Sequence, residues 1–143
     1  MAAELLVLFV FPVLLILAAG WDIASFTIPN FLQVALIVSF VAFVAVTGMT
    51  PAAIGAHLLA GFAGLAAGFA LFALGYIGGG DAKLFACIAL WLGFHNLPEY
   101  ALVASILGGA LTLILLGMRR LPLPAALSGQ SWILKLHEAR GAI

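Results

Sequence analysis

Five stretches of the 143-residue chain are apolar over lengths that reach, or nearly reach, across the roughly 30 Å hydrocarbon core of a bilayer. They are residues 5–20, 31–47, 57–76, 82–97 and 100–118. With 66% hydrophobic and 7% charged residues, the chain lacks the polar surface of a water-soluble domain. The sequence therefore predicts an all-α fold, a polytopic membrane helical bundle with five spans in a single domain over residues 1–143.

Turn-forming residues separate these stretches. Pro29-Asn30 opens the second, Gly78-Gly79-Gly80 precedes the fourth, and Asn96-Leu97-Pro98 ends it. The fourth stretch is short and carries Lys83 near its start, so we expect it to begin in a cavity or in a thinned part of the bilayer. The first lacks the basic region of a signal peptide, since Glu4 is the only charge before it, and we interpret it as a retained span.

The basic residues predict an orientation. Lys83 lies at the start of the fourth span, and the other four all follow the fifth span: Arg119, Arg120, Lys135 and Arg140. The positive-inside rule makes both places cytoplasmic. Counting back through alternating spans puts the N-terminus outside and both Asp22 and Asp81 at the cytoplasmic side. Residues 119–143 then form a cytoplasmic loop or tail, either flexible or with a short interfacial helix around Trp132.

Asp22 and Asp81 stand out among the five acidic residues because each directly adjoins an apolar span. A carboxylate at such a place costs several kcal/mol unless it faces a wet cavity or a partner. One interpretation is that each aspartate caps a helix N-terminus. The other is that the two carboxyls meet and share a proton, because like charges disfavour double ionisation. Such a pair activates water for hydrolysis, as in an aspartic protease.

The neighbours of Asp81 add weaker signals. Gly78, Gly79 and Gly80 let the backbone adopt positive φ and let a substrate strand approach closely, although a glycine triplet is equally a plain loop. Lys83 has three possible roles: it favours the ionised form of the Asp81 carboxyl, it binds a substrate carbonyl, or it only marks the inner boundary of the membrane.

Composition and spacing argue against several other classes of site. The three histidines do not cluster, and Cys87 is the single cysteine, so we expect no disulfide, metal or cofactor. A net charge of zero provides no basic surface for nucleic acid. Gly64 and Gly68 form a G-x-x-x-G pattern, which packs either within the fold or against a second copy as a homo-oligomer.

Two segments of the chain resemble the signatures of the type IV prepilin peptidases, above all the short forms that serve Flp or Tad-type pili. They are DIASFTIPN, which begins at Asp22, and GGGDAKL, residues 78–84. The resemblance covers nearly the whole chain. It implies a membrane-embedded aspartic endopeptidase of the bacterial inner membrane that removes the basic leader of prepilins at the cytoplasmic face. Asp22 and Asp81 correspond to the catalytic pair, Gly78 and Gly80 to the glycines of the G-x-G-D motif, and Pro29 and Asn30 to the end of the first signature.

Three departures from this family shape the expectation. Residues 23–28 carry no charge, whereas family members often have basic residues there, which leaves the contact to a leader open. Longer relatives also carry a cysteine-bearing N-terminal domain and N-methylate the new pilin terminus, and we expect peptidase activity only. Short relatives usually continue into a sixth span, which we expect after Ile143. The competing hypotheses are a small proton-coupled transporter, in which intramembrane carboxylates carry protons, and a non-catalytic membrane subunit of pilus assembly.

Overall fold

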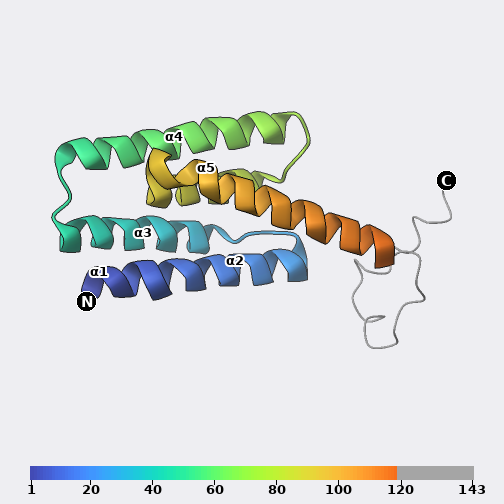
Figure 1. Ribbon diagram of the computed structural model, residues 1–143, viewed down its shortest axis with the longest axis horizontal. Coiled ribbons are helices and arrows are strands. Elements are labelled where there is room, and N and C mark those ends of the chain that lie inside the picture. Colours follow the sequence, from blue (N-terminus) through green and yellow to red (C-terminus); the bar gives the residue numbers. More distant parts are fainter. Residues whose placement is uncertain (119–143) are drawn as a thin grey trace. The chain divides into compact units, whose positions relative to one another are not determined.

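The computed structural model describes residues 1–118, which form helices joined by short connections (Figure 1). The elements are α1 (Ala2–Leu5), the π-helical turn η1 (Leu6–Val10), α2 (Phe11–Ser25), α3 (Asn30–Thr47), α4 (Pro51–Ala73) and α5 (Gly79–Met118). No strand occurs among these described residues, so the predicted all-α class is confirmed. The predicted cytoplasmic tail, with its interfacial helix, and the expected sixth span lie outside the described residues.

Four helical stretches within residues 1–118 are long and apolar enough to cross a membrane. The first is Ala2–Ser25, in which α1, η1 and α2 run on without interruption, and α3 and α4 are the second and third. The fourth, Gly79–Gly117, contains both the fourth and the fifth predicted span. The structure therefore has one broken helical element where the sequence predicts two separate spans.

The start of α4 differs from the prediction for a local reason. The helix begins at Pro51, six residues before the apolar stretch that starts at His57. Thr50 precedes it, and its side-chain oxygen accepts a hydrogen bond from the Ala53 N–H at 3.3 Å. Threonine before a helix and proline in its first turn are both favourable, so the helix is initiated by its cap rather than by hydropathy.

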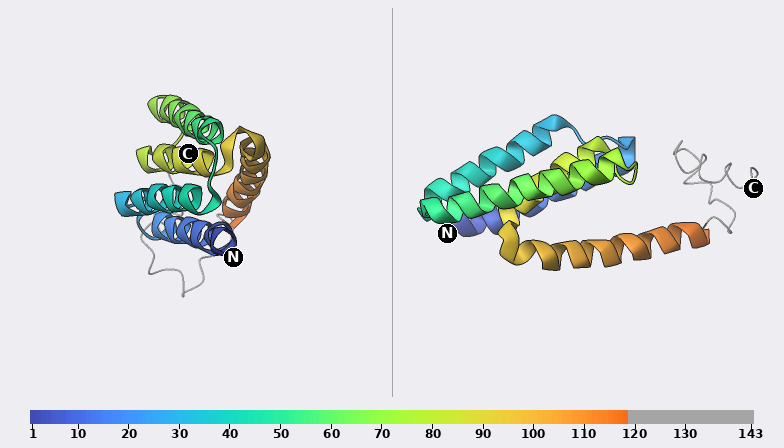
Figure 2. Two further views of the ribbon diagram at one scale, coloured as in Figure 1. Left: turned by 90° about the vertical axis from the view of Figure 1, so that its left-hand side faces the viewer. Right: turned by 90° about the horizontal axis from the view of Figure 1, so that it is seen from above.

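The described chain divides into two compact units, Met1–Pro98 and the residues from Glu99 on, of which the helical stretch 99–118 is described. Each unit is considered by itself. In the first unit, α2, α3, α4 and the beginning of α5 lie side by side as a bundle. The end-on view in Figure 2 shows the order α4, beginning of α5, α3, α2, so the beginning of α5 is inside the bundle rather than at its edge.

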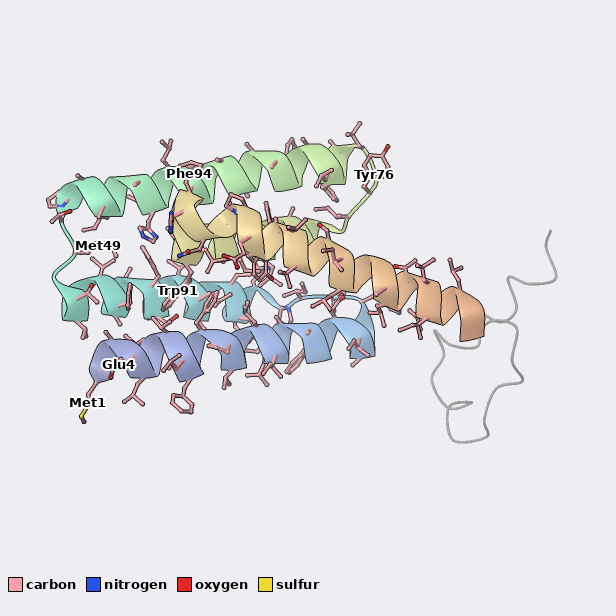
Figure 3. All side chains as sticks on the ribbon, in the orientation of Figure 1. Met1, Glu4, Met49, Tyr76, Trp91 and Phe94 are labelled. Atoms are coloured by element: carbon pink, nitrogen blue, oxygen red, sulfur yellow. The ribbon has the colours of Figure 1, made fainter. Side chains whose placement is uncertain are left out.

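The core of the first unit gathers around Trp91 of α5 (Figure 3). Its ring stacks on Phe11 of α2 with centroids 4.9 Å apart, and Phe40 of α3 packs against it edge-on. The indole N–H donates a hydrogen bond to the Leu36 carbonyl at 2.8 Å. Because a buried indole needs a partner for its N–H, this bond allows a large aromatic residue at the centre of an apolar bundle.

Glycines bring α4 unusually close to α5. A Cβ added at Gly64 would lie 2.6 Å from the Ala89 Cβ, and one added at Gly68 would lie 2.9 Å from the Ala82 Cα. These distances are shorter than real Cβ contacts allow, so the two backbones approach only because the side chains are absent. Of the two predicted uses of the G-x-x-x-G pattern, the structure shows packing within the fold.

The helix α5 is interrupted at Gly93, whose φ of 64° and ψ of 177° are not helical. The break thus lies a few residues before the predicted end of the fourth span at Asn96-Leu97-Pro98, and Pro98 lies inside the helical segment. Two carbonyls before the break bond to side chains: the His57 ring N–H donates to Leu90 at 2.7 Å, and Asn96 donates to Leu92 at 3.4 Å. These contacts satisfy backbone groups that a broken helix leaves without partners.

Candidate active site

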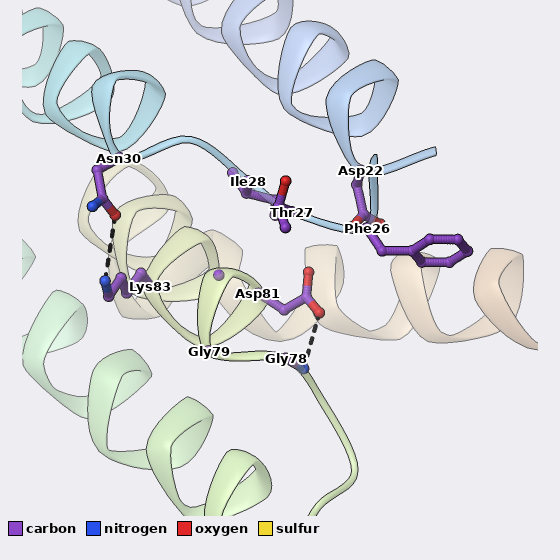
Figure 4. A pocket seen from close by; sticks show the side chains of 10 residues that line it. Asp22, Phe26, Thr27, Ile28, Asn30, Gly78, Gly79, Asp81 and Lys83 are labelled. Carbon is purple, nitrogen blue, oxygen red and sulfur yellow. Dashed lines mark hydrogen bonds between the residues drawn. The ribbon is translucent and has the colours of Figure 1, made fainter. Parts of the chain in front are cut away.

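A pocket of about 320 Å³ lies at one end of the first unit and joins three segments (Figure 4). The last turn of α2, the connection between α2 and α3, and the start of α5 all contribute. Its lining residues are Asp22, Phe26, Thr27, Ile28, Asn30, Gly78, Gly79, Gly80, Asp81 and Lys83. The structure thus brings together every site residue that the sequence predicts except Pro29, which is not among the lining residues.

Asp22 lies in the last turn of α2 and is partly buried. The helix ends at Phe26, which adopts a left-handed conformation with φ of 52° and donates its N–H to the Asp22 carbonyl at 2.7 Å. A residue at the end of a helix cannot cap an N-terminus, so that interpretation of Asp22 is wrong. The helix dipole disfavours a negative charge at this end, and within residues 1–118 no hydrogen bond to the carboxylate is present.

Asp81 occupies the opposite kind of position, in the first turn of α5. Its Oδ2 atom accepts the Gly78 N–H at 3.1 Å. This bond has the geometry of the acidic member of a capping box, in which the third helical residue bonds back to the residue before the helix. The helix dipole favours a negative charge here. Asp81 therefore helps to start α5, and the same bond fixes where its carboxylate points.

The two aspartates face the same space. In Figure 4 their side chains extend toward each other from α2 and from the start of α5. Both residues line the same pocket. Within residues 1–118, no further His, Cys, Asp or Glu joins them in a group that would hold a metal ion. The arrangement is a pair of carboxyls that line one pocket, which is large enough to hold water molecules.

The glycines before Asp81 do not have the backbone conformation that the sequence predicts. None of Gly78, Gly79 and Gly80 has a positive φ, which occurs instead at Gly75 with φ of 79°. A Cβ added at Gly80 would lie 3.3 Å from the Ile28 Cβ and 3.4 Å from the Ile28 nitrogen. Gly80 therefore lets the start of α5 pack against the connection that precedes α3. This close approach is one within the chain.

Lys83 points toward α3. Its ammonium donates a hydrogen bond to the Asn30 side-chain oxygen at 3.3 Å, as Figure 4 shows. Among the described residues the ion pair is that of the N-terminal amine with Glu4, and none joins Lys83 to an aspartate. The interaction with Asn30 links the start of α3 to α5 at the pocket.

Gln33 is a residue near the site that the sequence analysis missed. It lies in α3, one turn after Asn30, and its side chain is only 6% exposed. Its amide Nε2 donates a hydrogen bond to the Gly80 carbonyl at 3.4 Å. The signal was present in the sequence, because an amide inside a continuous apolar stretch needs a buried partner. The identity of that partner depends on how α3 and α5 pack.

Comparison of the sequence with known proteins places the chain in a family. The profile of the family described as "Type IV leader peptidase family" matches residues 9–113, which include both aspartates and most of the described helices. The chain belongs to the type IV leader peptidase family. The family match thus covers α2, α3, α4, most of α5 and all the residues that line the pocket.

Two curated relatives support the assignment to the type IV leader peptidases. The chain is 41% identical over 61 residues to the prepilin leader peptidase/N-methyltransferase of Pectobacterium carotovorum subsp. carotovorum, which is 43% of this chain and 21% of that protein. It is 37% identical over 57 residues to the protein of the same name from Dickeya chrysanthemi, 40% of this chain and 20% of the relative. The match thus spans about a fifth of the length of each. No solved structure shows a significant match to the chain.

Proposed function

We propose that this chain is a membrane-embedded aspartic endopeptidase that removes the leader peptide of type IV, Flp-like prepilins. One observation carries the proposal: in a member of the leader peptidase family, Asp22 and Asp81 line one pocket although two complete helices separate them along the chain. The pocket is at the ends of apolar helices, where a substrate with a polar leader and an apolar segment meets the edge of the membrane.

The surroundings of the two carboxyls give each a role in the proposed reaction. Asp81 accepts a backbone N–H and lies at the positive end of α5, so it is the ionised partner that takes a proton from water. The resulting hydroxide attacks the scissile carbonyl carbon. Asp22 donates its proton to the carbonyl oxygen. The C–N bond of the tetrahedral intermediate then breaks as the departing amine takes the proton that Asp81 received from water, and Asp22 recovers a proton from a hydroxyl of the intermediate as the new carboxyl group forms.

The location and the span count are parts of the same proposal. The positive-inside rule puts the pocket at the cytoplasmic face of the bacterial inner membrane and the N-terminus outside. A straight helix of 40 residues would be roughly 60 Å long, twice the hydrocarbon core, at a rise of 1.5 Å per residue. The break at Gly93 supports a division of α5 into two spans, which makes five in one peptidase domain.

We further propose that the chain cleaves without transferring a methyl group. Both curated relatives are named as peptidase and N-methyltransferase together, yet each is matched over about a fifth of its length. The pocket described above contains a carboxyl pair suited to hydrolysis. The mass of the new N-terminus, measured after incubation with a methyl donor, tests this point, and a methylated product would contradict it.

The decisive experiment incubates the purified protein in detergent with a prepilin peptide. Asp22→Asn and Asp81→Asn should each lower the cleavage rate by roughly three orders of magnitude or more, because neither amide can exchange the required proton. Glu4→Gln is the matched control, since Glu4 is an exposed carboxylate paired with the N-terminal amine. Cleavage that persists in either aspartate variant would overturn the mechanism. Ion flux into proteoliposomes without any peptide product would instead favour the transporter.

A further inference from the structure

A pair of catalytic carboxyls works only at a defined separation, and the two aspartates are carried by different helices. Asp22 reaches α3 through the short connection after α2, whereas Asp81 belongs to α5. Their separation is therefore set by whatever fastens the start of α3 to the start of α5. Two side-chain hydrogen bonds reach the first five residues of α5 from the start of α3: Gln33 to the Gly80 carbonyl, and Lys83 to Asn30. One turn further along α5, the Cys87 thiol also donates to the Gln33 carbonyl at 3.9 Å.

We propose that Gln33 is a positioning residue for Asp81. Its partner atom, the Gly80 carbonyl oxygen, belongs to the peptide group whose N–H is that of Asp81. Because a peptide group is planar, a bond to its oxygen restrains the orientation of the whole plane. The direction of the Asp81 Cα–Cβ bond follows from that plane. Gln33 thus acts on the carboxylate through one rigid group, from a position outside the pocket lining.

Burial makes Gln33 the more important of the two links. Its side chain is 6% exposed, while Lys83 and Asn30 are both exposed at the pocket. A hydrogen bond in a low-dielectric interior is strengthened, and a buried group left without its partner is costly. The exposed link exchanges readily with water.

This inference rests on the proposed peptidase function and concerns rate rather than substrate affinity. Gln33→Met keeps a long unbranched side chain but removes the N–H donor. We expect kcat for prepilin peptide cleavage to fall on the order of 10- to 100-fold while KM changes less than about twofold, as for a misplaced catalytic group. Ser39→Ala is the matched control. Ser39 is a buried polar residue of the same helix, and its hydroxyl bonds within that helix to Leu36.

The measurements separate the inference from the proposed function. If the wild-type protein cleaves, Asp22→Asn does not, and Gln33→Met matches Ser39→Ala in kcat, the positioning role is overturned and the aspartate mechanism stands. A rise in KM alone overturns it as well. If the wild-type protein does not cleave, the proposed function fails. The positioning role is then tested by a spin-label distance between the end of α2 and the residues just before α5.

That distance joins spin labels at Ile23→Cys and Tyr76→Cys in a Cys87→Ser background. Both positions are exposed, one beside Asp22 and the other just before α5. We expect Gln33→Met to broaden or lengthen the distance distribution relative to Ser39→Ala, because the start of α5 loses its buried link to α3. An unchanged distribution overturns the positioning role in a protein that shows no cleavage.

Discussion

Glycines in this chain serve two separable physical purposes at the scale of single residues. Gly48 ends α3 in a left-handed conformation with φ of 61°, and a Cβ there would meet no atom within 4 Å. Gly80 has no positive φ but lies against Ile28. The first glycine is required by backbone conformation and the second by packing. Substitutions at the two kinds of position should therefore fail for different reasons.

Gly48→Ala tests the conformational requirement alone. We expect it to lower the free energy of unfolding in detergent by about 1 kcal/mol, because an L-residue resists the left-handed region and no contact changes. Gly55→Ala is the control, since Gly55 is helical within α4 and also has open space around it. That change should raise stability by about 0.5–1 kcal/mol. Equal effects of the two substitutions would contradict this explanation of Gly48.

The residues at the pocket differ in how far the sequence predicts them. Asp22 and Asp81 are predictable because charged groups at the ends of apolar stretches are rare and costly. That both line one pocket is seen only in the structure, because it depends on how α2 and α5 pack. Gln33 was missed because an amide within a helix has no assigned role until its partner is known. Phe26 was also missed, since a left-handed conformation is usually assigned to glycine or asparagine.

At the scale of elements, the contact between α4 and α5 sets the position of the start of α5. The three glycines that face α5 make a graded series. Gly61 lies near the Leu90 side chain, Gly64 near the Ala89 Cβ, and Gly68 near the Ala82 backbone. Ala82 directly follows Asp81, so displacement of α5 at this point moves the carboxylate as well.

Gly68→Ala should destabilise the protein by about 1–3 kcal/mol and reduce prepilin cleavage, because the added methyl group meets backbone atoms that cannot rotate away. Gly61→Ala should cost less, because the nearest atom to its added Cβ, the Leu90 Cβ, is 3.2 Å away rather than 2.9 Å. Thermal unfolding in detergent and cleavage assays on both variants check the order. A Gly61→Ala effect as large as that of Gly68→Ala would contradict the packing argument.

Hydropathy predicts the helices well and their ends less well. The bounds of α3 follow the apolar stretch closely because Pro29 and Gly48 flank it. The sequence predicts the end of the fourth span at Asn96–Pro98, whereas the helical conformation of α5 breaks at Gly93. A proline near a helix start is tolerated, whereas the conformation of Gly93 is confined almost entirely to glycine. The contact with His57, which a Cβ at Gly93 would meet at 3.1 Å, comes from a distant helix and is not visible in local sequence.

For the whole molecule, the orientation in the membrane is the property that connects structure with substrate. Met49, between α3 and α4, and Tyr76, between α4 and α5, lie at opposite ends of the first unit (Figure 3). Tyr76 is at the end that holds the pocket, which the positive-inside rule puts in the cytoplasm. The prediction depends on basic residues, four of which lie outside the described residues.

Single cysteines test this orientation, because Cys87 is buried and is the one native cysteine. In a Cys87→Ser background, Ala52→Cys should react with a membrane-impermeant thiol reagent in spheroplasts. Tyr76→Cys should react only after the membrane is permeabilised. Both positions are exposed in the structure, so a missing reaction reflects sidedness rather than burial. The reverse pattern would put the pocket on the outer face.

The separation of the two aspartates along the chain also has a consequence for biosynthesis. Asp22 precedes α3 and Asp81 follows α4, so a chain that emerges from the ribosome inserts the whole α3–α4 pair between them. During synthesis Asp22 is made first, and Asp81 joins it in the pocket only when α5 packs against the glycines of α4. A hydrolase of the proposed kind would therefore be inactive during its own insertion. It could not cleave neighbouring membrane proteins until the last contacts of the bundle had formed.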